Sequence, residues 1–263
     1  IWNEKPYLTP ILKRLVSNFT GPQSSDIPVV TTTQIIPIAE KGGMKTDLVA
    51  TTIGYMMSDV PVFQSPHQRE RALSAASTIL NFKKLEELKE RSKVITQGVD
   101  VEELDKIREN AVKYDKFTVN YSSKLYGHKG YEDAFQLMDT AYASGKPIQI
   151  QVVTSSSYVK AMGAPSKYSV KYDHFKVYER ADRETFLKVS SKAHIFIMMA
   201  EYEDFPMTVL EQFYIGLIGI LPNKEWAHYV IGKDYQFLYN SKEEALEMLC
   251  YVIDNYGKLG HII

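Results

Sequence analysis

Short β-branched segments alternate with amphipathic helical segments along the chain, and this alternation limits most strongly the folds that the chain can adopt. Compact apolar runs such as residues 60–63 and 148–153 are typical of buried strands. Between them lie segments such as residues 131–143, where apolar side chains recur at three- and four-residue steps, as on one face of a helix. Strands that alternate with helices predict parallel sheets that helices cover on both faces.

The alternation restarts once, after the polar stretch at residues 113–116. We therefore expect two domains, residues 1–113 and residues 114–263, in the α/β class. Two such units in tandem predict two Rossmann-like domains that face each other across a cleft. The first is short for such a domain, so we expect either a fragment or a reduced version of the fold. The predicted strands span residues 27–33, 60–63, 93–96, 117–121, 148–153, 175–178, 194–199 and 217–221. The predicted helices span residues 44–57, 81–91, 101–112, 131–143, 183–190, 206–215 and 242–256, with another that begins at Pro66.

Composition excludes several classes of protein. The 31 Lys and Arg residues balance 32 Asp and Glu residues, for a net charge of -1, which is unlike a strongly basic nucleic-acid binder. The single cysteine, Cys250, excludes an intrachain disulfide and fits a reducing, cytoplasmic location. No apolar run approaches the roughly 20 residues that span a bilayer, so we expect no transmembrane segment.

The loop after the strand at residues 117–121 carries the first candidate site. It holds Lys124 and Lys129 among small residues and leads into a helix. Ammonium groups beside the start of a helix suit a polyphosphate, because the helix end adds partial positive charge. The alternative is an exposed basic loop without a function.

The loop after the strand at residues 194–199 carries the second candidate site. Glu203 precedes the helix that Pro206 begins, and Glu211 lies inside that helix. Two carboxylates placed in this way could each accept hydrogen bonds from a hydroxyl pair, as offered by a pyranose and a ribose joined through two phosphates. Alternatively, Glu203 only favours the helix start and Glu211 lies on a solvated face. Apolar neighbours of Glu211, such as Val209 and Phe213, argue against the solvated face.

These loops resemble motifs of one family. Residues 203–212 read EDFPMTVLEQ and are similar to the E-G-F-G-x-x-x-x-E-A motif of the glycosyl transferases group 1 family, retaining enzymes of the GT-B fold. Residues 123–124 and 129–130 (SK and KG) resemble the G-[RK]-x-x-x-x-K-G loop of that family. Residues 98–100 (GVD) resemble the turn that closes its first domain. The resemblance covers about residues 25–256.

The resemblance implies a glycosyltransferase that takes a sugar from a nucleotide-diphosphate sugar and moves it to a hydroxyl acceptor with retention. It implies no metal, no cofactor and no protein nucleophile. The catalytic group would be Lys124 and Lys129, which hold the donor diphosphate, and Glu203, which contacts the transferred sugar. Glu211 would bind the ribose. The other substrate-binding positions would be Ser123 in the phosphate loop, Phe205, Pro206, Met207 and Thr208 at the helix start, and Val177 beside the base.

The chain departs from the family motif at two glycines, which are replaced by Asp204 and Pro206. Asp204 adds negative charge near the sugar, and Pro206 removes a backbone donor. A second hypothesis is therefore a catalytically weakened module that binds a sugar nucleotide or a partner. A third concerns the acceptor, which would be a modified base in phage DNA. The near-zero net charge argues against tight DNA binding.

Overall fold

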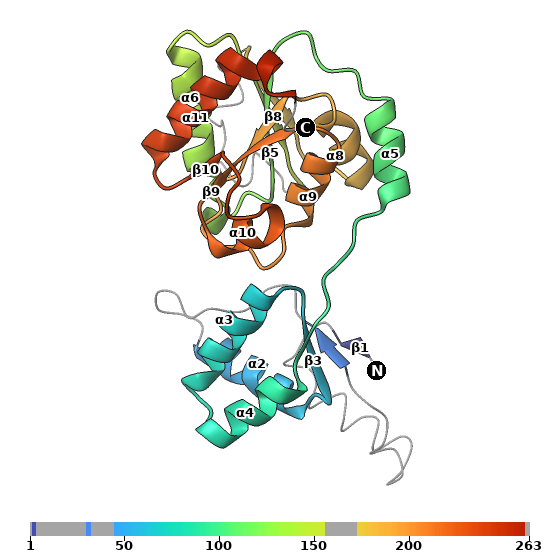
Figure 1. The fold of residues 1–263 in the computed structure, drawn as a ribbon, viewed down its shortest axis with the longest axis vertical. Helices are drawn as coiled ribbons and strands as arrows, with labels where there is room; N and C mark the ends of the chain where they lie inside the picture. Colours follow the sequence, from blue (N-terminus) through green and yellow to red (C-terminus); the bar gives the residue numbers. More distant parts are fainter. Residues whose placement is uncertain (1, 4–29, 33–44, 156–172, 261–263) are drawn as a thin grey trace. The chain divides into compact units, whose positions relative to one another are not determined.

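The computed structural model describes residues 2–3, 30–32, 45–155 and 173–260 (Figure 1). The chain forms two compact units, Ile1–Gly98 and Val99–Ile263. Each unit is described by itself below. Among the described residues, no helix combines the length and the apolar character needed to cross a bilayer.

The first unit contains a parallel sheet with the strand order β1-β2-β3-β4. Its core lies around β3 and the three helices, with Tyr55, Phe63 and Leu88 almost fully buried. The side chain of Ser65 accepts a hydrogen bond from the backbone of Gln68, so that helix α3 begins at Pro66 as predicted. The elements are β1 (Trp2–Asn3), β2 (Val30–Thr32), α2 (Lys45–Met57), β3 (Val60–Phe63), α3 (Pro66–Ser77), α4 (Phe82–Arg91) and β4 (Lys93–Val94). Most of the strand predicted at residues 27–33 lies outside the described residues.

The second unit is built on a six-stranded parallel sheet with the order β10-β9-β8-β5-β6-β7. The chain fills this sheet outward in two directions, first from β5 to β7 and then from β8 to β10. The direction reverses between β5 and β8, and open α/β sheets bind ligands at such a switch point. The strands are β5 (Thr118–Ser122), β6 (Gln149–Val153), β7 (Phe175–Tyr178), β8 (Ile195–Ile197), β9 (Ile218–Pro222) and β10 (Leu238–Tyr239).

Helices cover both faces of this sheet (Figure 1). Helices α6 and α11 pack with alternate strand residues such as Val119 and Ile195. Helices α5, α8, α9 and α10 pack on the other face with residues such as Phe196. Burial on both faces explains the nearly continuous apolar runs at residues 195–197 and 218–222. The helices are α5 (Val101–Glu109), α6 (Tyr131–Ala143), α8 (Arg183–Ser190), α9 (Met207–Tyr214), α10 (Glu225–Ile231) and α11 (Lys242–Asn255).

Helix α5 lies in the second unit, although we expected it before a boundary at Lys113. Its Leu104 is fully buried in one cluster with Leu187 and Val209 of α8 and α9. The division between the compact units therefore falls after Gly98. The amphipathic spacing of α5 predicts a buried face, but it does not reveal which core that face joins.

The sequence did not predict α10 and β10. Strand β10 has two residues, which pair with Leu221 and Pro222, and this is too short for a periodic pattern. Strand β8 is also shorter than the predicted span of residues 194–199, and α5 ends at Glu109 rather than at Val112.

Candidate functional site

The loops that follow β5 and β8 meet at the switch point of the second unit. The backbone N–H of Glu201 donates to the carbonyl of His128 over 3.1 Å. Gly130 has a φ of +65°, and a Cβ at this position would lie 2.1 Å from the carbonyl oxygen of Met199. Only glycine therefore permits the first loop to lie against the backbone of the second.

This contact brings two predicted site residues together. The Nζ atom of Lys129 lies 2.5 Å from Oε1 of Glu203. Their side chains are 18% and 10% exposed, respectively. Burial raises the pKa of Glu203, the ammonium of Lys129 opposes this change, and the charge of Asp204 adds to it. The site thus holds a cation and a carboxylate in contact at the carboxyl end of the sheet.

Lys124 lies on the same loop but in a different environment. Its side chain is exposed, and no ion pair found in the described parts of the chain includes it. Ser123 is half-buried directly after β5. An exposed ammonium can reach a ligand without first breaking a salt bridge.

Two aromatic rings from the same loops stack beside the ion pair. The rings of His128 and Tyr202 are 5.1 Å apart and nearly parallel, at 9°. Burial and the charge of Lys129 both lower the pKa of His128, so its ring is neutral at pH 7. Tyr202 carried no signal of its own in the sequence.

The start of α9 shows how the departures from the glycine-rich motif are accommodated. The N–H of Met207 donates to the carbonyl of Phe205 over 3.0 Å, and the N–H of Val209 donates to the carbonyl of Pro206 over 3.0 Å. Two backbone donors at this helix start are thus engaged within the protein. The ring of Phe205 also lies against Tyr229, 6.1 Å between centroids.

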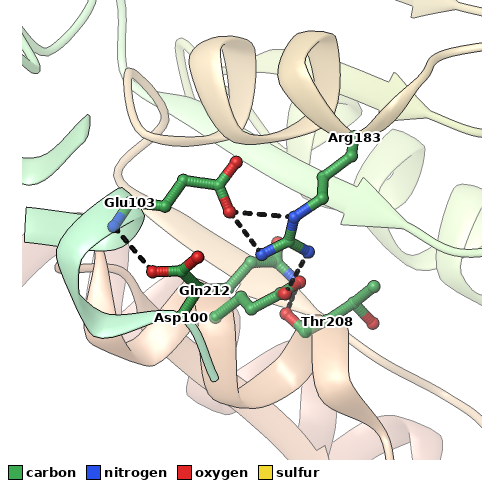
Figure 2. Close-up of polar contacts among 6 residues, drawn as sticks. Asp100, Glu103, Arg183, Thr208 and Gln212 are labelled. Carbon is green, nitrogen blue, oxygen red and sulfur yellow. Dashed lines mark hydrogen bonds and ion pairs between the residues drawn. The ribbon is translucent and has the colours of Figure 1, made fainter. Parts of the chain in front are cut away.

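Glu211 is buried and paired, not solvated. Its side chain is 3% exposed, and Oε1 accepts a hydrogen bond from Nη1 of Arg183 over 2.5 Å. Nε and Nη2 of Arg183 donate to Oε2 of Glu103 over 2.9 and 2.7 Å (Figure 2). Sequence reasoning missed Arg183. The available signal was a cation in the first turn of a helix, where the dipole disfavours positive charge.

A buried polar cluster holds α9 in place beneath this site. Nδ2 of Asn120 donates to Oε1 of Gln212 over 2.7 Å and to Oγ of Ser190 over 3.1 Å. Nε2 of Gln212 donates to the carbonyl of Thr208 over 3.0 Å (Figure 2). These contacts join β5 and α8 to Gln212, the residue that follows Glu211 in α9.

Val177 lies apart from these loops, in β7 at the edge of the sheet, where it pairs with Val152 of β6. Its contact with a base stays a prediction, as do the roles of the other predicted site residues. Within the described ranges, no group of three or more His, Cys, Asp and Glu side chains is arranged to hold a metal ion.

A doubly wound α/β unit with charged loops at its switch point defines a Rossmann-like ligand-binding domain. Comparison with known families then identifies the particular family. The model of the glycosyl transferases group 1 family matches residues 102–258, more than half of the chain, and the chain belongs to this family. A comparison with the curated proteins found no match.

Solved structures share the fold at low sequence identity. TarM of S. aureus superposes with a TM-score of 0.68 at 8% identity, over 98% of this chain and 48% of TarM. Pneumococcal O-GlcNAc transferase GtfA, in complex with UDP and GlcNAc, gives a TM-score of 0.59 at 10% identity, over 89% of this chain and 46% of its own. Anabaena HepE, in complex with UDP-glucose, gives 0.61 at 15% identity, over 91% and 67%.

These likenesses confirm the predicted GT-B fold class. The chain spans about half the length of TarM and GtfA.

Proposed function

We propose that the chain transfers a sugar from a nucleotide-diphosphate sugar to a hydroxyl acceptor, with retention and without a metal ion. The observation that carries the proposal is the contact between Lys129 and Glu203 at the switch point of the second unit. Family membership supports the reaction class. The ligands named for GtfA and HepE, which are UDP and UDP-glucose, make uridine donors the first to test.

The chemistry follows from an exchange of partners. Lys129 and Glu203 neutralise each other in the structure. A bound donor offers its diphosphate to Lys129 and its sugar hydroxyls to Glu203, so both side chains keep a partner. Lys124, exposed on the same loop, adds a second cation. Glu211 accepts hydrogen bonds from the ribose.

During transfer, the bond between the anomeric carbon and the diphosphate oxygen breaks, and negative charge grows on the diphosphate. The ammonium groups stabilise this charge, which lowers the barrier. The acceptor oxygen bonds to the same carbon on the same face, and its proton passes to the leaving diphosphate. No protein nucleophile takes part.

The test compares donor binding with release of the nucleoside diphosphate. Calorimetric titration with UDP-, GDP- and ADP-sugars identifies the donor, and a release assay measures its turnover, including hydrolysis by water. We expect Lys129→Met to lower release by about 10²–10³-fold, as for removal of one stabilising donor. Glu203→Gln should lower release by about 10–10²-fold, as for loss of a hydrogen bond to a charged group. Lys146→Met is the matched control, because it removes a lysine that pairs with Asp254 away from the site. Unchanged release in both site variants would remove the proposal.

Retention, metal independence and the DNA acceptor are each tested by a separate measurement. Nuclear magnetic resonance of the first product gives the anomeric configuration, and an inverted product would contradict retention. Turnover that persists in a chelator supports metal independence. A mobility-shift assay on hydroxymethylated duplex DNA across a salt series tests the DNA acceptor, which stays a prediction. A complex that weakens with salt is the expected result for that acceptor.

A second candidate is a module that binds the sugar nucleotide but does not transfer it. The observation that favours it is the buried Asp204, whose charge raises the pKa of Glu203 further. The backbone N–H of Met207 also favours this candidate, because it donates to a carbonyl within the protein. Calorimetric binding with no release for any bound donor would select this candidate.

A further inference from the structure

Arg183 is the charged residue nearest to Glu211 that the proposed function leaves without a role. Its guanidinium contacts Glu103 of α5 (Figure 2) and Glu211 of α9, which are carboxylates from two other helices. The two carboxylates differ in exposure, with side chains 37% exposed for Glu103 and 3% exposed for Glu211. Arg183 itself is 48% exposed. The arginine therefore lies between solvent and a buried carboxylate.

The buried Glu211 carboxylate needs a charged partner. Burying an unpaired charge costs free energy, and a paired, hydrogen-bonded charge offsets this cost. Nη1 of Arg183 is the hydrogen-bond donor that the described residues place on Oε1 of Glu211. An ionised carboxylate has about four acceptor positions, so others remain for a hydroxyl pair.

The position of Arg183 is itself unfavourable without these partners. It is the first residue of α8, where the helix dipole disfavours a cation. Asp182, the N-terminal cap of α8, satisfies the backbone of Thr185 by a hydrogen bond of 2.8 Å, so the helix start needs no arginine. The placement is explained by the carboxylates that Arg183 contacts.

Glu103 determines the orientation of the guanidinium. Its Oε2 accepts from both Nε and Nη2, and a two-donor contact restricts the guanidinium plane. Glu103 is in turn located by the start of α5, where its backbone N–H donates to Oδ1 of Asp100 over 3.0 Å. With one side of the fork fixed, Nη1 is directed at Glu211.

We propose that Arg183 is a positioning residue of the donor site, which orients the Glu211 carboxylate toward the ribose hydroxyls, so that selectivity for ribose over 2′-deoxyribose depends on it. This inference rests on the proposed function, because it assumes that Glu211 binds the ribose. Arg183 acts through Glu211, and Glu103 acts through Arg183.

The experiment measures binding of UDP, GDP and ADP and of their 2′-deoxy counterparts by calorimetry on the full chain. For the nucleotide that binds best, we expect the unsubstituted protein to prefer ribose by roughly tenfold or more, as for a hydrogen bond to a charged group. Arg183→Gln should reduce this preference to below about threefold, and Glu211→Gln should do the same. The double variant should lose no more than either single one, because both act on one interaction.

Matched variants separate positioning from folding. Arg183→Lys keeps the charge without the two-donor fork and should retain an intermediate preference. Lys242→Gln removes another cation that pairs with a carboxylate, Asp133, and should leave the preference unchanged. Far-ultraviolet circular dichroism and the melting temperature show whether each variant folds.

The outcomes distinguish the two proposals. If Glu211→Gln removes the ribose preference and a folded Arg183→Gln keeps it, the role of Arg183 is wrong and the proposed function stands. If a folded Glu211→Gln keeps the preference, Glu211 does not bind the ribose, and the role of Arg183 is wrong with it. If no nucleotide binds at all, the proposed function itself is wrong. If Arg183→Gln does not fold, Arg183→Lys and Glu103→Gln replace it, and full preference in both overturns the role of Arg183.

Discussion

The two ends of the six-stranded sheet each place a lysine from a loop against neighbouring elements, and the partners differ. At the amino end, Nζ of Lys113 donates to three backbone carbonyls, those of Ser191, Ala193 and Gly216, over 3.1, 2.6 and 3.1 Å. At the carboxyl end, Lys129 contacts one carboxylate. A ligand can replace a side-chain partner, whereas main-chain carbonyls are released only by unfolding. The same residue type therefore serves stability at one end and suits exchange with a ligand at the other.

The largest expected effect belongs to the close approach at the carboxyl end. Gly130→Ala would place a Cβ 2.1 Å from the carbonyl oxygen of Met199, in a backbone conformation with φ of +65°. We expect a loss of about 4 kcal/mol or more in the free energy of unfolding, measured by urea denaturation.

Gly145→Ala is the matched control, because Gly145 also has a positive φ, +93°, but a Cβ there would meet nothing within 4 Å. It should cost about 1–2 kcal/mol, which is the conformational part alone. Equal losses in the two variants would mean that the approach of the loops is unimportant.

The second effect concerns the amino end. Lys113→Met removes the donor of three carbonyls, and we expect a loss of about 3 kcal/mol, because unsatisfied acceptors remain at the ends of α8 and α9. Burial lowers the pKa of Lys113 to about 8, so the ammonium is still largely charged at pH 7. Urea denaturation at pH 7 measures the change, and nucleotide binding by the folded variant should be normal.

Lys116→Met serves as the control for this variant, since Lys116 is an exposed neighbour. Its effect should stay within about 0.5 kcal/mol. If Lys113→Met is equally mild, or if it weakens nucleotide binding, the contrast between the two ends of the sheet is wrong.

Much of the fold could be predicted because its determinants are local. Helix α6 spans Tyr131–Ala143, as its apolar spacing predicts, and β7 spans Phe175–Tyr178 as predicted. The contact between Lys129 and Glu203 could also be predicted, because the carboxyl ends of parallel strands lie at the same edge of a sheet.

What could not be predicted depends on distant partners. The role proposed for Arg183 depends on its ion pairs with Glu103 and Glu211. These three residues lie in three different helices, and no periodic pattern in the sequence connects them. Gly130 belongs to the loop that resembles a phosphate-binding motif, yet its close neighbour is the backbone of Met199, which lies far away in the sequence. Asn120 alternates with apolar residues along its strand, but this pattern does not reveal that its partner is Gln212 of α9.

The smallest predicted effect is a pH dependence of stability that arises at the amino end of the sheet. Nδ1 of His194 accepts a hydrogen bond of 3.0 Å from the N–H of Thr118, which requires an unprotonated nitrogen. Burial, and then the charge of Lys113, lower the pKa of His194 to about 4, from 6.5 in an unfolded chain. The unfolded chain thus binds this proton more readily. The contribution of His194 to stability is complete above pH 6.5 and is lost as the pH falls toward 4.

His194→Asn keeps an acceptor but does not titrate, so its stability should vary less with pH. Between pH 6.5 and 4 we expect the variant to lose roughly 1–2 kcal/mol less than the unsubstituted protein, as measured by urea denaturation at several pH values. Lys113 does not contribute in this window, because it stays protonated below its own pKa of about 8. Parallel pH profiles for the two proteins would show that His194 does not cause the pH dependence of stability between pH 6.5 and 4.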